Sequence, residues 1–205
     1  MTAQKDWTGN SKAIYSCHGA SNHSETERET NDFYATPPVA AEMLLDLEDF
    51  SHDIWEPCCG QGHIAEVLKE HRYNVKATDL IDRGYGQGNV DFLQCTKPWN
   101  GDIITNFPYS MAAEMTMHAM DLLQDGHKLA SFLKLTFLEG QGRKVLFDTY
   151  PPKTIYVARA RFGCAKNGEF KVDKNGKLKA DSAVCYCWMI WEKGFHGDPV
   201  VKWFN

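Results

Sequence analysis

Along the chain, the spacing of hydrophobic and polar positions switches several times between the 3.6-residue period of a helix and the continuous apolar run of a buried strand. Apolar residues within 33–50 recur at helical spacing after two prolines, and proline is tolerated in the first turn of a helix. Ile54-Trp55 then begins a short strand that leads into a glycine turn at 60–62, and a period of 3.6 resumes at 64–68. The pattern therefore predicts a helix, a strand, a glycine turn and a second helix, in that order.

The same alternation continues through the following residues. Further strands are predicted at 74–79, 102–105, 128–135, 154–158 and 183–191, and further helices at 111–124 and 141–148. The run 183–191 is apolar throughout, which is typical of a strand buried on both faces. Strands that alternate with helices indicate an α/β fold with a mainly parallel central sheet and helices on both faces.

Two segments fall outside this pattern. Residues 1–32 are mostly small and polar, so we expect an N-terminal arm followed by one domain at 33–205. Two Asn-Gly turns in a basic stretch predict a hairpin insertion near 163–181. The chain has 205 residues, 43% of them hydrophobic, which suffices for one ordinary core. No run approaches the roughly 18 apolar residues of a membrane helix and the polar start lacks a signal peptide, so we expect a cytoplasmic protein.

The formal net charge of −5 is distributed unevenly along the chain. Residues 1–150 hold 12 Lys and Arg against 22 Asp and Glu, whereas 151–205 hold 10 against 5. A basic C-terminal quarter attracts phosphate backbones, although a solvated, lysine-rich hairpin would have the same composition. The charge pattern is thus compatible with a nucleic-acid partner without requiring one.

The seven cysteines do not form a recognisable framework. Their number is odd and no paired Cys-x-x-Cys spacing occurs, which argues against a disulfide scaffold and against a structural zinc site. Cys17, His18 and His23 are near one another in sequence, but such residues in a polar segment are more often incidental. We therefore expect no metal.

The glycine turn is the first feature that points to a ligand. Gly60-Gln-Gly62 follows a strand and precedes a helix, so a ligand can approach its backbone closely. Asp79 lies 17 residues after Gly62 at the end of the second predicted strand, where a carboxylate can accept hydrogen bonds from ribose hydroxyls. Together they indicate a cofactor that contains adenosine. Ala65 stands where the dinucleotide fingerprint has its third glycine, so NAD remains possible but is not favoured.

A second motif directly follows the predicted strand 102–105. Asn106-Phe107-Pro108-Tyr109 resembles the Asn-Pro-Pro-Tyr motif of S-adenosylmethionine-dependent amino-methyltransferases. Other segments match that family in the same order: Tyr34-Ala35-Thr36-Pro37, Glu56-Pro57-Cys58-Cys59-Gly60-Gln61-Gly62, Asp79 and Asp91-Phe92. The later stretch 132–143, with Arg161-Phe162, looks like the small DNA adenine-N6 methyltransferases common on phages and other mobile elements.

This resemblance, which covers roughly 31–205, implies a fold and a cofactor. The fold would be the Rossmann-like class I methyltransferase fold with about seven strands in its sheet. The cofactor would be S-adenosylmethionine, with the turn from Glu56 through Pro57, Cys58 and Gly60 to Gly62 at its methionine part. By the same resemblance, its ribose would lie at Asp79 and its adenine at Asp91 and Phe92. Thr36 and Pro37 would close over the methionyl end, and Tyr34 and Asn106 would complete the site.

The resemblance also assigns the chemistry to the second motif. The exocyclic amine of adenine is a poor nucleophile because its lone pair is delocalised into the ring. The Asn106 side-chain oxygen and the carbonyl of Phe107 or Pro108 would accept its N–H groups. Tyr109 would stack on the base after it is flipped out of the duplex, which offsets an unstacking cost of a few kcal/mol. The implied enzyme is a site-specific DNA adenine methyltransferase.

Phe107 departs from the family pattern and keeps three alternatives open. DNA enzymes usually have proline there, whereas ribosomal-RNA adenine dimethylases are similar in allowing a bulky apolar residue. Protein-glutamine methyltransferases share the motif because an amide nitrogen poses the same chemical problem. A non-catalytic nucleic-acid-binding relative is the alternative from outside the enzymes.

Nucleic-acid contacts are expected C-terminal to the second motif. The motif order resembles the gamma arrangement of amino-methyltransferases, and the chain is too short for a large recognition domain. The candidate contacts are basic side chains in the last third of the chain: Arg143, Lys144, Arg161, Lys171, Lys174 and Lys177.

Neutralising Lys171, Lys174 and Lys177 together is expected to weaken DNA binding to a similar degree on all sequences and to flatten its salt dependence. The reason is that phosphate contacts position a duplex without reading its bases. Binding isotherms on several unrelated duplexes at a series of salt concentrations test this. A loss confined to one sequence would contradict it.

Overall fold

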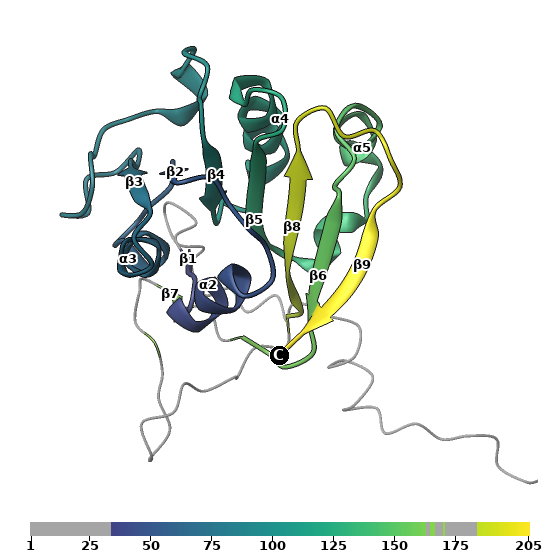
Figure 1. The fold of residues 1–205 in the computed structure, drawn as a ribbon, viewed down its shortest axis with the longest axis horizontal. Coiled ribbons are helices and arrows are strands. Elements are labelled where there is room, and N and C mark those ends of the chain that lie inside the picture. Colours follow the sequence, from purple (N-terminus) through teal and green to yellow (C-terminus); the bar gives the residue numbers. More distant parts are fainter. Residues whose placement is uncertain (1–33, 163–164, 167–169, 171–183) are drawn as a thin grey trace, which may run out of the picture.

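The computed structural model describes residues 34–162, 165–166, 170 and 184–205. The predicted arm at 1–32 and most of the predicted hairpin, including Lys171, Lys174 and Lys177, lie outside the described residues. The described residues form one seven-stranded sheet with helices on both faces, which confirms the expected α/β architecture (Figure 1).

The strand order in this sheet is β3-β2-β4-β5-β8-β6-β9. The bounds are β2 (Asp53–Glu56), β3 (Asn74–Ala77), β4 (Asp102–Thr105), β5 (Lys128–Lys134), β6 (Thr154–Ala158), β8 (Tyr186–Glu192) and β9 (Val200–Phe204). β8 pairs antiparallel with β5 and β6, and the other pairings are parallel. The sheet is therefore mainly parallel, as predicted.

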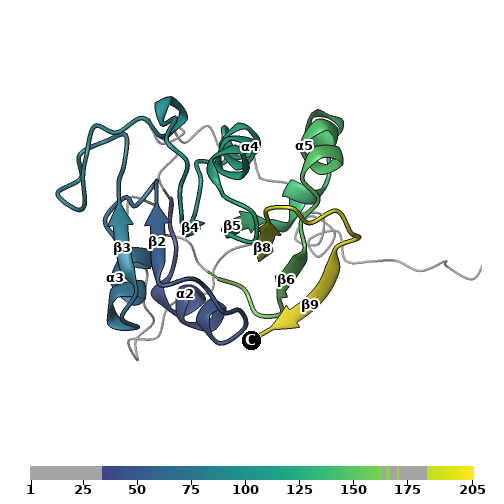
Figure 2. The same cartoon turned by 45° about the horizontal axis from the view of Figure 1, so that its top comes forward.

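In the part of the chain that the structure describes, four helices cover the two faces. They are α2 (Pro38–Leu45), α3 (His63–Glu70), α4 (Ala112–Leu122) and α5 (Lys144–Thr149). Figure 2 shows α4 and α5 on one side of the sheet and α2 and α3 on the other. Three single turns of 3-10 helix, η1 (Phe92–Gln94), η2 (Leu135–Leu138) and η3 (Gln141–Arg143), complete the connections. The predicted helix 141–148 is thus divided between η3 and α5.

The core consists of two layers separated by the sheet, and β8 contributes to both. Cys187, Met189 and Trp191 face the layer that contains α4 and α5, whereas Trp188 and Ile190 face the layer that contains α2 and α3. The Trp188 indole donates to the Ala40 carbonyl of α2 at 2.8 Å, and the Trp191 indole donates to the Tyr150 carbonyl after α5 at 3.0 Å. The apolar run predicted as a doubly buried strand therefore secures a helix on each side.

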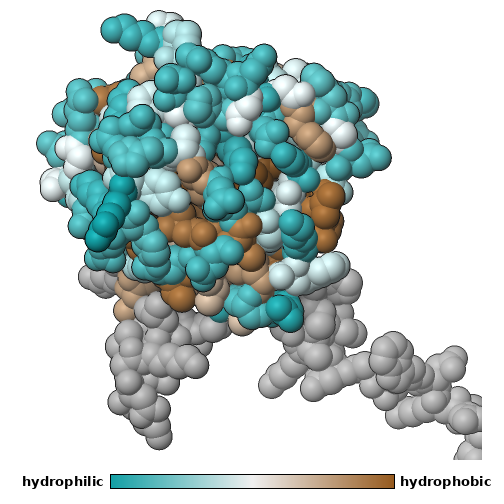
Figure 3. Space-filling view, in the orientation of Figure 1, coloured by the Kyte–Doolittle hydropathy of each residue, from teal (hydrophilic) through white to brown (hydrophobic). Residues whose placement is uncertain are grey.

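Three strands lie outside the ranges predicted as strands, and one of them falls in the segment 163–181 that was predicted as a hairpin. β1 (Tyr34–Ala35) pairs antiparallel with β7 (Ala165–Lys166) in a separate two-stranded sheet. β9 pairs parallel with β6 at the edge of the main sheet. Most of β9 is exposed, including Trp203 at 60%, so no alternation of buried and exposed positions identifies it. Figure 3 shows a mostly hydrophilic surface interrupted by apolar patches.

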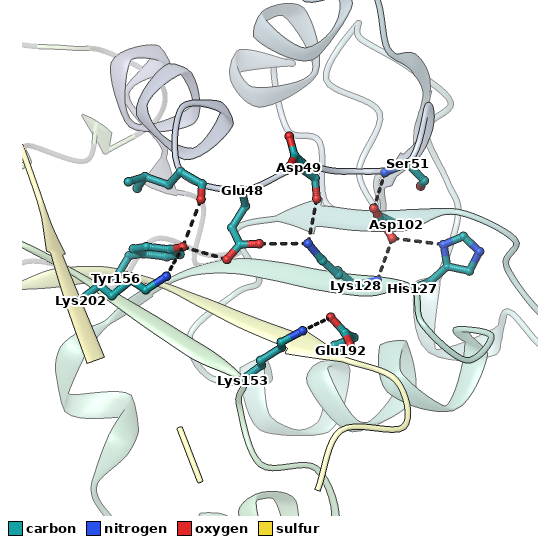
Figure 4. A network of polar contacts seen from close by, with 11 residues as sticks. Glu48, Asp49, Ser51, Asp102, His127, Lys128, Lys153, Tyr156, Glu192 and Lys202 are labelled. Atoms are coloured by element: carbon teal, nitrogen blue, oxygen red, sulfur yellow. Dashed lines mark hydrogen bonds and ion pairs between the residues drawn. The ribbon is translucent and has the colours of Figure 1, made fainter. Parts of the chain in front are cut away.

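A polar network joins the amino ends of the parallel strands to the segment that follows α2 (Figure 4). Asp102, only 3% exposed, accepts hydrogen bonds from the backbone N–H groups of Ser51 at 2.6 Å and Lys128 at 2.7 Å. The Lys128 ammonium contacts the Glu48 carboxylate at 2.9 Å, and Glu48 also accepts from the Tyr156 hydroxyl at 2.8 Å. These bonds hold the starts of β4 and β5 in register with the loop before β2.

Replacing Asp102 with alanine is expected to lower the free energy of unfolding by about 3 kcal/mol, because two backbone N–H groups lose their acceptor in a buried place. Urea unfolding measures the change. Asp148→Ala is the control, since its pair with Lys144 lies on the exposed surface of α5 and is expected to contribute less than about 0.5 kcal/mol. Equal losses in the two variants would contradict the structural role of Asp102.

Candidate active site

The carboxyl ends of the parallel strands lie together at the end of the sheet opposite this polar network. We call this end the carboxyl edge. The chain leaves β2 toward β3 on one side and later leaves β4 toward β5 on the other, so the strand order reverses between β2 and β4. In open α/β sheets, ligands bind outside the carboxyl ends at such a reversal. The two sequence motifs follow β2 and β4, and the structure therefore brings them together.

The glycine turn after β2 needs its glycines for backbone reasons. Gly60 has φ +54° and Gly62 has φ +86°, a region that residues with a Cβ rarely adopt. The Tyr85 ring packs so closely on Gly62 that a Cβ there would lie 2.5 Å from it. Gly62 also precedes the first residue of α3, so the turn presents the helix N-terminus to the site.

Asp79 holds this turn in place from the end of β3. Its carboxylate accepts hydrogen bonds from the Gly60 N–H at 2.8 Å and from the Ile81 N–H at 2.9 Å. Each carboxylate oxygen retains a further lone pair, so Asp79 can both support the turn and accept a ligand hydroxyl. Leu80 beside it is 57% exposed and offers an apolar surface next to that carboxylate.

Glu56, at the end of β2, is a buried acid whose charge is poorly compensated. It is 2% exposed, and its Oε2 has no hydrogen-bond partner among the described residues. Burial raises the pKa of its carboxyl well above the usual value, a hydrogen bond from the Ala65 N–H opposes this rise, and the nearby Asp79 charge adds to it. A cationic ligand group at this position would stabilise the ionised form.

The neighbouring thiols are not suited to nucleophilic chemistry. Burial raises the pKa of Cys58 well above its ordinary value and that of Cys59 to about 12, with contributions from the charges of Glu56 and Asp79. Both cysteines therefore carry protonated thiols at neutral pH.

Asp91 and Phe92 lie at the beginning of η1. Asp91 is exposed and accepts a hydrogen bond from the Leu93 N–H at 3.0 Å. Phe92 is 2% exposed and stacks on Phe107 with ring centroids 5.7 Å apart. The ring that the resemblance places against a cofactor thus belongs to the hydrophobic core in this structure.

Phe107 lies in the same core layer, with 1% of its surface exposed. Its side chain packs in the layer that contains α4 and stacks on Phe92. The unusual residue of the second motif therefore fills core volume. Its backbone carbonyl remains part of the motif.

The side-chain amide of Asn106 has one partner and one unpartnered atom. Its Nδ2 donates to the backbone carbonyl of Tyr34 at 2.8 Å. Its Oδ1 is buried and has no hydrogen-bond partner within the described part of the chain. Buried polar atoms are nearly always paired, so an unpaired acceptor at this edge indicates a place for a ligand donor.

The first segment of the resemblance lies against the second motif. The Tyr34 ring stacks on the Tyr109 ring with centroids 5.5 Å apart. Thr36 is 3% exposed and its Oγ1 is likewise unpartnered among the described residues, while Pro37 immediately precedes α2. Tyr34 therefore directly contacts Asn106 and Tyr109, which are predicted to hold the methyl acceptor.

Four residues near these motifs were not singled out from the sequence. The Lys134 ammonium, at the end of β5, lies 4.1 Å from the Tyr109 ring centroid. The Tyr186 hydroxyl at the start of β8 accepts from the Tyr109 hydroxyl at 3.4 Å. Tyr85 and Leu80 adjoin the glycine turn and Asp79. Position at the carboxyl end of a predicted strand is the signal that could have identified Lys134.

The described basic residues on the predicted nucleic-acid side have partners of their own. Arg143 donates to the Glu139 carbonyl and lies over the Phe137 ring, with 4.6 Å from its guanidinium carbon to the ring centroid. Lys144 pairs with Asp148 on α5. Arg161 donates to the Cys185 sulfur at 2.8 Å.

Within the described segments of the chain, no group of three or more His, Cys, Asp or Glu side chains is placed to hold a metal ion. None of the helices in these segments has the length and apolar character to cross a membrane.

Comparison with known proteins defines the fold. No protein-family model and no curated protein matches the chain. Among solved structures, an assigned RNA methyltransferase of Pyrococcus horikoshii is similar with TM-score 0.57 at 12% identity, over 92% of this chain and 100% of that one. An assigned class I S-adenosylmethionine-dependent methyltransferase of Listeria monocytogenes gives 0.55 at 12% identity, over 88% and 68%.

TrmN from Thermus thermophilus is also similar, with TM-score 0.51 at 16% identity, over 76% of this chain and 48% of that one. Identities this low concern the fold alone. The chain has the Rossmann-like class I methyltransferase fold, as the sequence motifs implied.

Gly62→Ala is expected to lower the free energy of unfolding more than Gly126→Ala does. Both glycines have nearly the same φ, +86° and +84°, but only Gly62 is packed against a ring. The backbone penalty, about 1 kcal/mol, is common to both variants. Thermal or urea unfolding measures the difference, which isolates the Tyr85 contact.

The contact between Gly62 and the Tyr85 ring also predicts that changes at these two residues have non-additive effects on the free energy of unfolding. In a Tyr85→Ala background, the loss caused by Gly62→Ala should fall to that of Gly126→Ala. An unchanged loss in that background would show that the ring contact is not responsible.

Proposed function

We propose that this protein is an S-adenosylmethionine-dependent methyltransferase that transfers a methyl group to the exocyclic N6 of adenine in DNA, within a domain at 33–205. The observation that carries the proposal is the unpartnered, buried Oδ1 of Asn106 at the carboxyl end of β4. Among the described residues no donor reaches this acceptor, which lies in the motif of Pro108 and Tyr109 and follows the strand next to the one that precedes the glycine turn. The fold neighbours that are methyltransferases support the same class of reaction.

The residues around the glycine turn fit S-adenosylmethionine. This cofactor carries an ammonium and a sulfonium, and Glu56 is a buried carboxyl with a raised pKa whose Oε2 has no hydrogen-bond partner among the described residues. It also carries ribose hydroxyls and a flat adenine, for which Asp79 offers an acceptor and Leu80 an apolar surface. Bound there, the cofactor supplies an activated methyl group. Gly60 and Gly62 allow the positive-φ turn that would lie against it.

The second motif fits an amine acceptor. Asn106 Oδ1 and the carbonyl of Phe107 or Pro108 would accept the two N–H bonds of the amine and favour a tetrahedral nitrogen as it is methylated. Tyr109 would hold the base by stacking once the Lys134 ammonium, now 4.1 Å from its ring centroid, has moved aside, while Tyr34 stays stacked on the ring. Phe107 supports this reading because its side chain packs in the core and leaves the asparagine and the carbonyls at the edge. No strongly basic side chain is required.

DNA is our choice of substrate because of the basic C-terminal quarter and the resemblance to DNA adenine-N6 enzymes. RNA is the second candidate, since the P. horikoshii neighbour is assigned as an RNA methyltransferase. The contacts proposed for the phosphate backbone are Arg143, Lys144, Arg161 and the three hairpin lysines.

Transfer of labelled methyl from S-adenosylmethionine to unmethylated duplex DNA and to unmodified ribosomal RNA, followed by nucleoside digestion and mass spectrometry, tests the proposal. We expect N6-methyladenine in the DNA. Label found only in RNA would support the second candidate instead. No transfer despite measurable cofactor binding would contradict both.

Asn106→Ala is expected to reduce methyl transfer by at least about 100-fold, because it removes an acceptor aligned with the reacting amine. Cofactor binding, measured by calorimetry, should remain. Asn100→Ala is the control, since Asn100 is an exposed asparagine near the opposite edge of the sheet. Unchanged methylation by Asn106→Ala would refute the role of this residue.

A further inference from the structure

The hydrogen bond between Asn106 and Tyr34 determines which atom of the Asn106 side-chain amide faces the proposed methyl acceptor. A backbone carbonyl can only accept, so the amide atom 2.8 Å from the Tyr34 oxygen must be nitrogen. The opposite orientation would place two oxygens against each other. Oδ1 is thereby directed to the other side, where it is buried and receives no hydrogen bond from a described residue.

The segment that carries the Tyr34 carbonyl is held by strand pairing, by a buried neighbour and by a ring contact. Tyr34 and Ala35 form β1, which pairs with Lys166 and Ala165 of β7. The Ala35 side chain is buried, with 4% exposed, and the Tyr34 ring is stacked on Tyr109 of the same motif. A main-chain group fixed in this way cannot easily turn away from Asn106.

We propose that Tyr34 is a positioning residue, whose main-chain carbonyl orients the Asn106 amide so that Oδ1 accepts from the substrate amine. The inference rests on the proposed function, because it assigns a reason for asparagine at the reacting position. Asparagine satisfies two demands at once, as it donates to Tyr34 through Nδ2 and accepts through Oδ1. A carboxylate satisfies only the second, since both of its oxygens are acceptors.

Asn106→Asp tests this because its protonated and ionised forms differ in whether the side chain can donate a hydrogen bond to the Tyr34 carbonyl. The ionised form places an oxygen against the Tyr34 carbonyl and is repelled, whereas the protonated form donates its O–H to that carbonyl and keeps the other oxygen free. Burial beside a carbonyl raises the pKa of the introduced carboxyl. Below that pKa the variant should be active, and activity should be lost as the pH rises through it.

We expect kcat of Asn106→Asp to be about 100-fold below wild type near neutral pH, the effect of displacing one preorganised hydrogen-bond partner. Relative to wild type, kcat should recover as the pH is lowered from about 8.5 to about 5.5, in the range where a buried carboxyl titrates. Asn100→Asp, the same chemical change at an exposed site, should follow the wild-type pH profile throughout.

Two results would overturn the inference. One is Asn106→Asp activity equal to wild type above neutral pH, which would show that the carbonyl contact is immaterial. The other is a folded, cofactor-binding Asn106→Asp variant that stays inactive at every pH, which would show that the protonated form does not restore the geometry. An inactive wild type on both DNA and RNA would refute the proposed function instead.

A second measurement does not depend on the variant folding or on activity. In isotope-labelled wild-type protein, the Asn106 side-chain nitrogen should show a through-hydrogen-bond scalar coupling to the Tyr34 carbonyl carbon by NMR. Absence of this coupling, with the side-chain amide signal assigned, would overturn the inference by itself. Its presence together with the pH recovery of Asn106→Asp would establish it.

Discussion

The structure depends on a sheet whose central strands are apolar on both faces. β8 is the clearest case, because Trp188 packs toward α2 and Trp191 toward α5. Such a strand is stable only if helices cover both sides, and each covering helix removes one face of the sheet from contact with ligands. Ligands are left with the two ends of the sheet, which we call the amino edge and the carboxyl edge after the strand ends that form them. Because most strands are parallel, these two edges differ chemically.

The two edges differ in how completely their polar groups are paired. At the amino edge, Asp102 and Lys128 take part in several hydrogen bonds and the network connects three strands with the segment after α2 (Figure 4). At the carboxyl edge, Glu56, Thr36 and Asn106 each bury an atom that no described residue satisfies. Thr116 and His118 of α4 and Ser131 within β5 also bury an unpaired atom, so such atoms are not confined to this edge. Unpaired buried atoms cost stability, and a ligand could satisfy those at the carboxyl edge.

Phe107 illustrates how a departure from a family pattern can be a packing adjustment. The phenylalanine fills the core between β4 and α4 and stacks on Phe92, which is also buried. Proline at that position would leave volume that neighbouring side chains would have to fill. In the proposed function, the groups that would touch a methyl acceptor belong to Asn106, Pro108, Tyr109 and the main chain, and the Phe107 side chain is not one of them.

Much of the fold follows from the sequence, because periodicity reports burial. The run 183–191, the strand 102–105 and the glycine turn could be read directly, since their apolar pattern or their need for positive φ is a local property. β1 and β9 could not, because two residues or a mostly exposed strand carry no periodic signal and form only where a partner strand is supplied. The candidate site shows the same division. Motif order indicated Glu56, Asp79 and Asn106, whereas the Tyr34 carbonyl on Asn106, the Tyr85 ring on Gly62 and Lys134 above Tyr109 arise from contacts between segments distant in sequence. Residue types and their spacing thus determined which polar groups are present. Only the tertiary structure decided which of their atoms are paired and which are left unpaired, because hydrogen bonds between distant segments depend on positions that no local pattern encodes.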